Sequence, residues 1–310
     1  MEEHRNRHLT QAVRRIAAIL AIAVCGTDAF GQAKPPIAGH YPPGQTGLRG
    51  AAFATPGLSF TNFNRLFSNL EMKGGNGETL GSVGEGRYAN VSMITWTTER
   101  TVLGMNYGAL LGVPFSTGNL TPSGDDAGTG GFDLGDVLVT PVSLYGRTSD
   151  LDYQLQFTVW SASGRFSPGA PDNRGTGFWS LVYSIGAVWY PGGDRDNWSL
   201  SAIARFEQNF EQASSGITPG NDVVVDWGLG KMLQFRGHPF EVGVSGFAVW
   251  QLSEQSSGNS NRYRYYGIGP EISVALTDRW AIRLRAHWEF AARNAIQGNN
   301  IWFILNYKIY

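Results

Sequence analysis

The sequence predicts an all-β protein, a transmembrane antiparallel β-barrel of about twelve strands with short periplasmic turns and long outer loops. Three observations support this prediction: the composition, the alternation of apolar and polar residues in many segments, and the alternation of long and short connections. Glycine supplies 41 of 310 residues. Because glycine costs about 1 kcal/mol per helical position relative to alanine, this composition disfavours helices.

The first thirty-one residues read as a secretory signal peptide. Four arginines precede an apolar run over residues 16–25, which is too short to span a bilayer because about 20 residues are needed. Small residues at Ala29 and Gly31 favour cleavage before Gln32, with Ala33 as an alternative end. A lipoprotein that uses Cys25 is the other alternative. Cleavage before Gln32 removes this cysteine, the only one in the sequence.

Residues 32–56 are rich in proline and glycine and show no alternating pattern. They fit either a plug in the periplasmic mouth of the barrel or a disordered tail. The sequence therefore divides into a signal peptide (1–31), an N-terminal periplasmic segment or plug (32–56) and a barrel (57–310).

Period-two alternation marks the strands. It is clearest over residues 103–115, 151–160 and 282–290. In the last of these, the apolar residues Ile282, Leu284, Ala286, Trp288 and Phe290 alternate with Arg283, Arg285, His287 and Glu289. Weaker copies cover residues 58–67, 87–97, 134–145, 177–190, 198–209, 222–233, 240–252, 265–276 and 301–310. Each segment is long enough to cross a bilayer as a tilted strand.

The connections between these segments alternate in length. Long polar loops are expected over residues 68–86, 116–133, 161–176, 210–221, 253–264 and 292–300. Short links are expected over residues 98–101, 146–150, 191–197, 233–239 and 277–279. Bacterial outer-membrane barrels have short periplasmic turns and longer outer loops, so the predicted location is the outer membrane and the lipid bilayer is a predicted partner.

The charged residues decide which face of each strand meets lipid. A lipid-facing arginine near the bilayer midplane costs about 2 to 4 kcal/mol, so the polar face must line the lumen. Tryptophans at both strand ends, such as Trp96 and Trp280 beside short links and Trp179 near a long loop, suggest two interfacial belts. The alternative is a soluble barrel with its apolar face inside. The predicted lumen-lining residues are Asp152, Gln154, Gln156, Asp222, Asp226, Glu271, Arg283, Arg285, His287 and Glu289.

Five stretches carry a resemblance to a known family. They are GHYPPGQTGLRGA (39–51), LGMNYGALLGVPF (103–115), LGDVLVTPVSLYG (134–146), TGFWSLVYSIGAVWYPGG (176–193) and GIGPEISVAL (267–276). In order and spacing they resemble the outer-membrane family named after the meta-pathway of phenol degradation. The resemblance covers nearly all of the mature chain. It implies an outer-membrane barrel that transports aromatic or other hydrophobic compounds.

Three positions depart from a regular barrel. Pro141 and Pro270 interrupt predicted strands and remove ladder donors, so bulges or strand ends are expected there. Tyr310 ends the chain, but it is out of phase with the apolar series that ends at Ile309, which leaves either the last pairing or Tyr310 itself outside the usual terminal register.

No enzyme is predicted, and no cofactor, catalytic residue or metal site is expected. His287, Glu289 and Glu271 form the best metal candidate, but a lone histidine beside acids is more often a salt-bridge partner. A net charge of -1 gives the chain no excess of positive charge to bind phosphates, so nucleic acid is not expected as a partner.

The predicted function is an outer-membrane channel for passive uptake of small solutes, and the family resemblance implies hydrophobic or aromatic ones. Its predicted partners are the lipid bilayer, a small-molecule solute and the outer-membrane assembly machinery. The alternative is a closed structural or adhesive barrel that acts through its surface loops. Both signs of charge occur among the lumen residues, so they could form a constriction that orients a solute or could simply pair with one another.

Overall fold

The computed structural model describes residues 36–82, 87–116, 133–168, 170, 173–258 and 260–310. The predicted signal peptide lies outside the described residues. The described part of the chain contains no helix long and apolar enough to cross a membrane.

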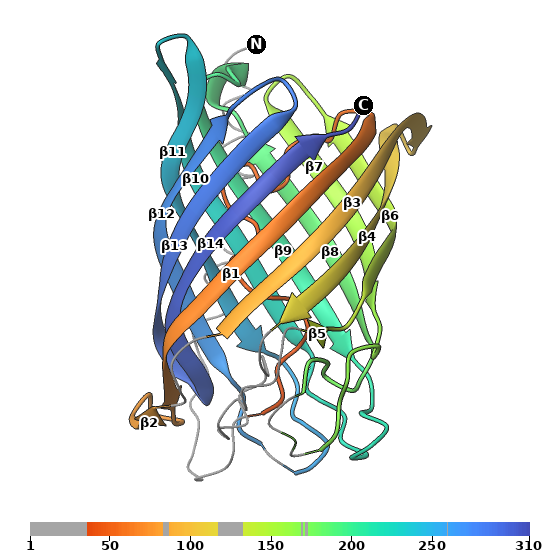
Figure 1. Cartoon of the computed structure of the whole chain (residues 1–310), viewed down its shortest axis with the longest axis vertical. Coiled ribbons are helices and arrows are strands. Elements are labelled where there is room, and N and C mark those ends of the chain that lie inside the picture. The colour runs from red at the N-terminus through yellow and green to blue at the C-terminus, as the bar shows by residue number, and fades with distance from the viewer. Residues whose placement is uncertain (1–35, 83–86, 117–132, 169, 171–172, 259) are drawn as a thin grey trace, which may run out of the picture. The chain divides into compact units, whose positions relative to one another are not determined.

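Twelve long antiparallel strands of the described chain form one closed barrel (Figure 1). They are β1 (Gly57–Lys73), β3 (Arg87–Val102), β4 (Met105–Ser116), β6 (Leu138–Arg147), β7 (Leu151–Trp160), β8 (Ser180–Trp189), β9 (Trp198–Asn209), β10 (Asp222–Phe235), β11 (His238–Gln251), β12 (Arg264–Ala275), β13 (Trp280–Arg293) and β14 (Ala295–Lys308). Pairing of β14 with β1, from Ser59 opposite Lys308 to Lys73 opposite Ala295, closes the ring. Closure leaves no open edge in the bilayer, and the predicted fold class is confirmed.

The connections differ at the two ends of the barrel. Tight turns join β3 to β4 at Leu103 and Gly104 and β10 to β11 at Arg236 and Gly237, and all four residues have positive φ. Two successive residues with positive φ form a two-residue turn whose twist matches that of the flanking strands. At the other end the connections are longer, except the one between β13 and β14. Two short strands there, β2 (Thr79–Ser82) and β5 (Asp133–Leu134), extend the sheet beside β1 and β4.

The expected long loop over residues 292–300 is wrong. Strands β13 and β14 are joined through Asn294 alone, which has a φ of 49°. The polar stretch that suggested a loop continues β14, and Gln297 pairs there with Glu71 of β1. Asparagine tolerates the left-handed conformation that this connection requires, so a tight turn needs no glycine here.

The two faces of the strands separate apolar from polar residues. On β13 the side chains of Leu284, Trp288 and Phe290 are exposed, whereas Arg285 and His287 are buried. The other strands repeat this arrangement, with exposed residues such as Ile185 of β8 and Leu229 of β10. Apolar side chains therefore face the lipid and charged ones face the lumen. This arrangement excludes a soluble barrel with an apolar interior.

Aromatic residues lie near both ends of the exposed face. Near the short turns, Trp96 and Trp198 are exposed, and Trp280 stacks on Tyr307 with ring centroids 4.3 Å apart. Near the long connections, Trp179 is exposed. These positions fit two interfacial belts, which set the position of the barrel across the bilayer.

The proline and C-terminal expectations have different outcomes. At Pro141 the register of β6 shifts against both β4 and β7, which is the expected bulge. At Pro270 the pairing of β12 with β13 lapses between Ile268 and Glu271, but the register is kept. Strand β14 ends at Lys308, and Tyr310 beyond it still exchanges backbone hydrogen bonds with Leu58 of β1.

Candidate functional site

The N-terminal segment (residues 36–56) lies inside the ring of strands. Figure 1 shows it in red within the barrel. Leu48 and Ala51 of this segment are fully buried. Five inward-facing carboxylates bind the segment, one from each of β7, β9, β10, β11 and β12. They are Asp152, Glu207, Asp226, Glu241 and Glu271.

Asp226 of β10 binds the middle of the segment. Its carboxylate accepts hydrogen bonds from the Tyr41 hydroxyl at 2.5 Å, the Gly44 amide at 2.9 Å and the Thr46 hydroxyl at 2.7 Å. Arg205 of β9 lies 3.1 Å from the same carboxylate and donates to the Thr46 hydroxyl. One buried acid thus fixes three residues of the segment through charge-assisted bonds.

Glu271 and Arg285 hold the next turn of the segment. The two side chains are fully buried and form a bidentate pair, with Nε to Oε2 at 2.7 Å and Nη2 to Oε1 at 2.8 Å. Glu271 also accepts from the Leu48 amide at 3.1 Å, and Arg285 donates to the Gly44 carbonyl. The ion pair therefore satisfies a donor and an acceptor of the segment backbone.

Two glycines allow this close approach. A Cβ at Gly44 would lie 2.7 Å from Nδ1 of His287, and Gly44 has a φ of +79°. A Cβ at Gly47 would lie 2.0 Å from a carboxylate oxygen of Glu271. Any side chain at either position would displace the segment from the wall.

The end of the segment is held near the short turns. Asp152 of β7 accepts from the Phe53 amide at 3.1 Å and pairs with Arg147 and Arg195. Arg49 pairs with Glu241 of β11 at 2.9 Å. Contacts at this end and at the middle leave the segment anchored along much of its length.

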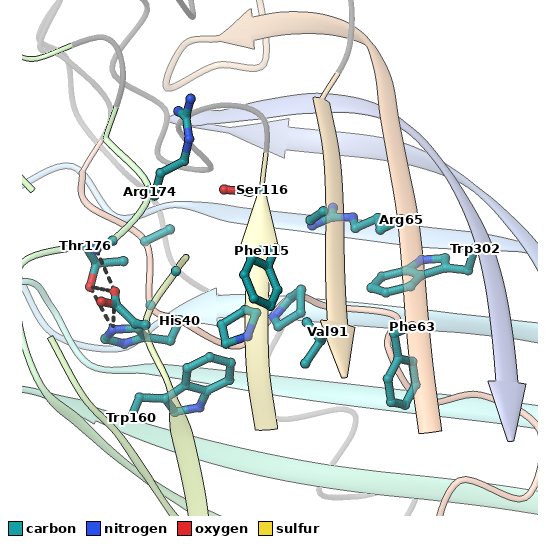
Figure 2. A pocket seen from close by; sticks show the side chains of 18 residues that line it. His40, Phe63, Arg65, Val91, Phe115, Ser116, Trp160, Arg174, Thr176 and Trp302 are labelled. Carbon is teal, nitrogen blue, oxygen red and sulfur yellow. Dashed lines mark hydrogen bonds and ion pairs between the residues drawn. The ribbon is translucent and has the colours of Figure 1, made fainter. Parts of the chain in front are cut away.

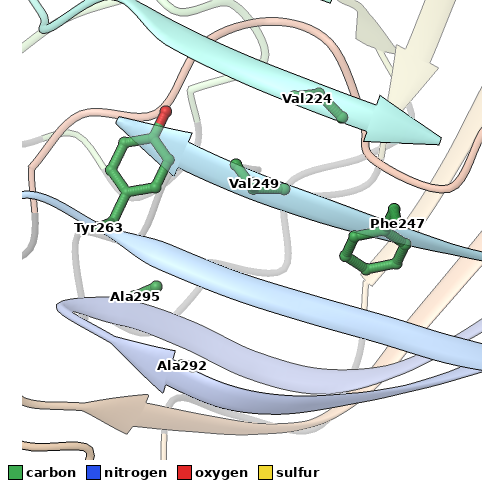
Figure 3. Close-up of a cluster of buried hydrophobic side chains, with 6 residues drawn as sticks. All are labelled: Val224, Phe247, Val249, Tyr263, Ala292 and Ala295. Atoms are coloured by element: carbon green, nitrogen blue, oxygen red, sulfur yellow. The ribbon is translucent and has the colours of Figure 1, made fainter. Parts of the chain in front are cut away.

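An apolar cluster supports the segment on one side of the lumen. Figure 3 shows its members, which come from β10, β11, β13 and β14 and from the residue before β12. They are Val224, Phe247, Val249, Tyr263, Ala292 and Ala295. Ala38 and Tyr41 of the segment pack against this cluster. Apolar burial therefore adds to the polar anchors on this wall.

His40 joins the segment to the long-connection end of the barrel. Its ring lies 3.2 Å from both Asp136 and Glu207, and it stacks on Trp160. Thr176 and Ser180 also bond to its ring nitrogens. Burial alone would lower the pKa of His40, but the hydrogen bonds and charges of the two carboxylates outweigh it and raise the pKa from 6.5 to about 9.

We expect this contact to loosen at alkaline pH. Because the pKa is raised by folding, the stabilisation is complete below about 6.5 and is lost as the pH rises through about 9. Neighbouring Tyr41 does not titrate in this range, because burial raises the pKa of its hydroxyl above its ordinary value. Single-channel current should therefore increase between pH 8 and pH 10 in the wild type. The His40→Gln variant should show no such step, and a wild-type current that stays constant over this range would contradict the assignment.

Two of the cavities beside the segment share lining residues. The first, called the loop-side cavity, has a volume of about 780 Å³ including its open mouth, and Figure 2 shows its lining. Its walls include Phe63 and Arg65 of β1, Trp160 of β7 and Trp302 of β14. The lining thus includes aromatic rings among other apolar residues, with a few polar groups that converge on the cavity.

The second cavity, called the lumen passage, measures about 1190 Å³ including open space and shares Phe63 and Trp160 with the first. It runs between the segment and the inner wall. Its lining contains three arginines, Arg49, Arg205 and Arg283, and no acidic residue. No carboxylate among the described residues lines the passage beside these arginines.

The sequence-predicted lumen residues have three different surroundings. Asp152, Asp226, Glu271 and Arg285 contact the segment or its anchors, and Gln154, Gln156 and Arg283 line the lumen passage. Asp222 accepts from the Tyr263 hydroxyl, His287 bonds to Ser245, and Glu289 accepts from Gly298 and Asn300. The described residues contain no cluster suited to a metal ion.

Sequence reasoning missed several inward residues. Glu207 and Arg205 share a phase with Ser199 and Ser201 on β9, and Arg65 lies in phase with Phe63 on β1. The same period-two rule that found Arg285 would have found Glu207 and Arg205. Arg65 gives a weaker signal, because both faces of β1 contain polar and aromatic residues.

The fold resembles known outer-membrane barrels. A solved outer-membrane channel from Pseudomonas putida F1 is 12% identical, with a TM-score of 0.67, covering 86% of this chain and 99% of that chain. The β domain of the Bordetella autotransporter BrkA is 12% identical, with a TM-score of 0.50, covering 82% of this chain and all of that chain (100%). These similarities concern the fold. A comparison with curated protein sequences found no match.

A family model agrees with the resemblance found in the sequence. The model described as "Putative MetA-pathway of phenol degradation" matches residues 74–305, which is well over half of the chain and includes eleven of the twelve barrel strands in full or nearly in full. The chain therefore belongs to this family of outer-membrane β-barrels.

Proposed function

We propose that this protein is an outer-membrane channel for the passive uptake of small solutes, in particular hydrophobic or aromatic compounds. The observation that carries the proposal is the lumen passage beside the N-terminal segment, which shares the aromatic residues Phe63 and Trp160 with the loop-side cavity. The family description, which refers to phenol degradation, and the Pseudomonas putida outer-membrane channel of similar fold support it. No cofactor and no bond chemistry are required.

In this proposal the N-terminal segment acts as a plug that narrows the lumen to the passage. The predicted lumen-lining residues then have two roles, since some anchor the plug and others form the wall along which the solute moves. The partners are the lipid bilayer, which contacts the exposed apolar face, and the solute. We further propose that outer-membrane assembly machinery inserts the barrel, although its C-terminal register is shifted.

Two substitutions at adjacent positions test the proposal. Ser184 of β8 faces the lumen passage, whereas Ile185 is 62% exposed on the lipid face. Ser184→Trp should obstruct the passage because an indole fills space that a hydroxymethyl group leaves open. Ile185→Trp places the same side chain in lipid and serves as the matched control. We expect Ser184→Trp to reduce the initial uptake of labelled phenol by Gram-negative cells to the rate of cells without the protein.

Uptake in whole cells is the appropriate measurement, because the native outer leaflet hinders hydrophobic compounds that simple lipid bilayers pass. Heat-modifiable gel mobility should show that both variants fold. Equal uptake with and without the wild-type protein would instead favour the closed structural or adhesive barrel.

A further inference from the structure

Arg65 of β1 is a buried cation without an acidic partner. It is 9% exposed, and its Nε donates to the Asn300 side chain at 2.6 Å. No carboxylate of the described residues forms an ion pair with it. Glu289 acts on it electrostatically, but its carboxylate accepts hydrogen bonds from the Gly298 amide and the Asn300 side chain. The terminal nitrogens of Arg65 can therefore donate further hydrogen bonds at the edge of the loop-side cavity.

Trp302 of β14 adds a second unused donor. It lies opposite Arg65 in the β1–β14 pairing and is 2% exposed, and its indole N–H has no hydrogen-bond partner among the described residues. Buried indole N–H groups usually find an acceptor, so an unpaired one beside a cavity is unusual. The Arg65 guanidinium lies 5.4 Å from the Trp302 ring centroid and 4.6 Å from that of Phe67. These rings fix the guanidinium by cation–π contact without neutralising it.

The walls around these donors suit an aromatic ring. Phe63, Val91 and Trp160 line the same cavity, and Figure 2 shows them grouped with Arg65 and Trp302. Asp136 also lines the cavity, but its carboxylate already accepts from Thr176 and the Gly164 amide and pairs with His40. The charge left uncompensated in the cavity is therefore positive.

The lumen passage also presents positive charge to an anion. Arg49 and Arg205 are paired with acids, but Arg283 has a buried Nε without a hydrogen-bond partner and lines the passage. An anion that leaves Arg65 would thus meet a second arginine further along the inner wall. Neutral hydrocarbons would gain no ion pair or hydrogen bond from either cation.

We propose that the loop-side cavity binds aromatic carboxylates, with the carboxylate accepting hydrogen bonds from the terminal nitrogens of Arg65 and the indole N–H of Trp302 and the ring lying among Phe63, Val91 and Trp160. The proposal deepens the proposed function by naming the solute class, and it rests on that function only for the onward movement past Arg283. Binding itself can be measured separately from transport.

The test is equilibrium dialysis of labelled benzoate against the full mature chain in neutral detergent micelles at pH 7. Cyclohexanecarboxylate retains the anion without the aromatic ring, and benzyl alcohol retains the ring without the anion. We expect benzoate to bind more tightly than either compound. Arg65→Gln should weaken benzoate binding at least about tenfold, the size expected for loss of hydrogen bonds to a charged group, and leave benzyl alcohol unaffected.

Trp302→Phe provides an independent test, because it removes the indole N–H and retains an aromatic wall. It should weaken benzoate binding by a factor of about 10 to 100, as expected for one hydrogen bond to a charged acceptor. Arg100→Gln, an exposed arginine near the other end of β3, is the control and should bind as the wild type does. Heat-modifiable mobility checks that each variant folds.

The inference is overturned if benzoate binds no more tightly than benzyl alcohol, or if folded Arg65→Gln and Trp302→Phe both bind benzoate as the wild type does. Either result leaves the uptake proposal standing when Ser184→Trp still blocks phenol uptake. Conversely, benzoate binding that depends on Arg65 in a barrel that transports nothing would reject the channel and keep the binding site.

Discussion

Replacing Asp226 by alanine should raise the single-channel conductance several-fold. The substitution removes the acceptor for Tyr41, Gly44 and Thr46 at once, and hydrogen bonds to charged groups contribute about 1.5 to 3 kcal/mol each. It also leaves Arg205 without its acidic partner inside the lumen. Release of the middle of the N-terminal segment would join the lumen passage to the space that the segment now fills. Currents in planar bilayers at neutral pH provide the measurement.

Asp278→Ala is the control for this experiment, because Asp278 is exposed in a short turn and touches no part of the segment. Limited trypsin digestion supplies a second measurement, since Arg49 in the segment should become cleavable when the anchor is lost. A folded Asp226→Ala barrel with wild-type current and a protected Arg49 would show that the segment is not a movable plug.

The strand pattern was predictable because the bilayer imposes it. A residue such as Arg285 cannot face lipid without a cost of several kcal/mol, so its phase on β13 fixes the phase of the whole strand. Most short turns were predictable for the same reason, since strands of a set length must reverse at each interface. The link expected over residues 98–101 is wrong, because β3 continues to Val102 and the turn lies at Leu103 and Gly104. All twelve predicted strands occur in the structure.

The strand ends beyond the apolar band were less predictable. Outside the bilayer no lipid enforces alternation, so the polar residues after Arg293 read as a loop although they extend β14. Gln297 pairs with Glu71 there, and this pairing of two polar strand ends leaves no hydrophobic signature.

The arrangement inside the lumen could not be predicted from the pattern of each strand alone. Periodicity indicates that Asp226 and Glu271 face inward, but not that both bind the backbone of residues 44–48. Those contacts depend on the path of a segment that has no periodicity, held at Gly44 and Gly47 by close approach to the wall. The sequence therefore left a plug and a disordered tail as equal alternatives for this segment.

The Glu271–Arg285 pair provides the second large prediction, which concerns stability. Glu271→Ala should lower the free energy of unfolding by about 3 to 5 kcal/mol, because it leaves a fully buried guanidinium uncompensated. It also removes the acceptor of the Leu48 amide. The measurement is urea unfolding of the barrel in lipid vesicles, followed by heat-modifiable gel mobility.

Glu254→Ala is the matched control, because Glu254 pairs with Arg262 at 3.7 Å where both side chains are about half exposed. Such a surface pair contributes only about 0 to 1 kcal/mol. The double variant Glu271→Ala/Arg285→Met should be more stable than Glu271→Ala alone, since a buried cation without a partner is worse than an apolar side chain of similar length. If the double variant is instead the less stable of the two, Arg285 stabilises the barrel mainly through its bond to the Gly44 carbonyl, and the pair matters as an anchor of the segment more than as a neutralised charge.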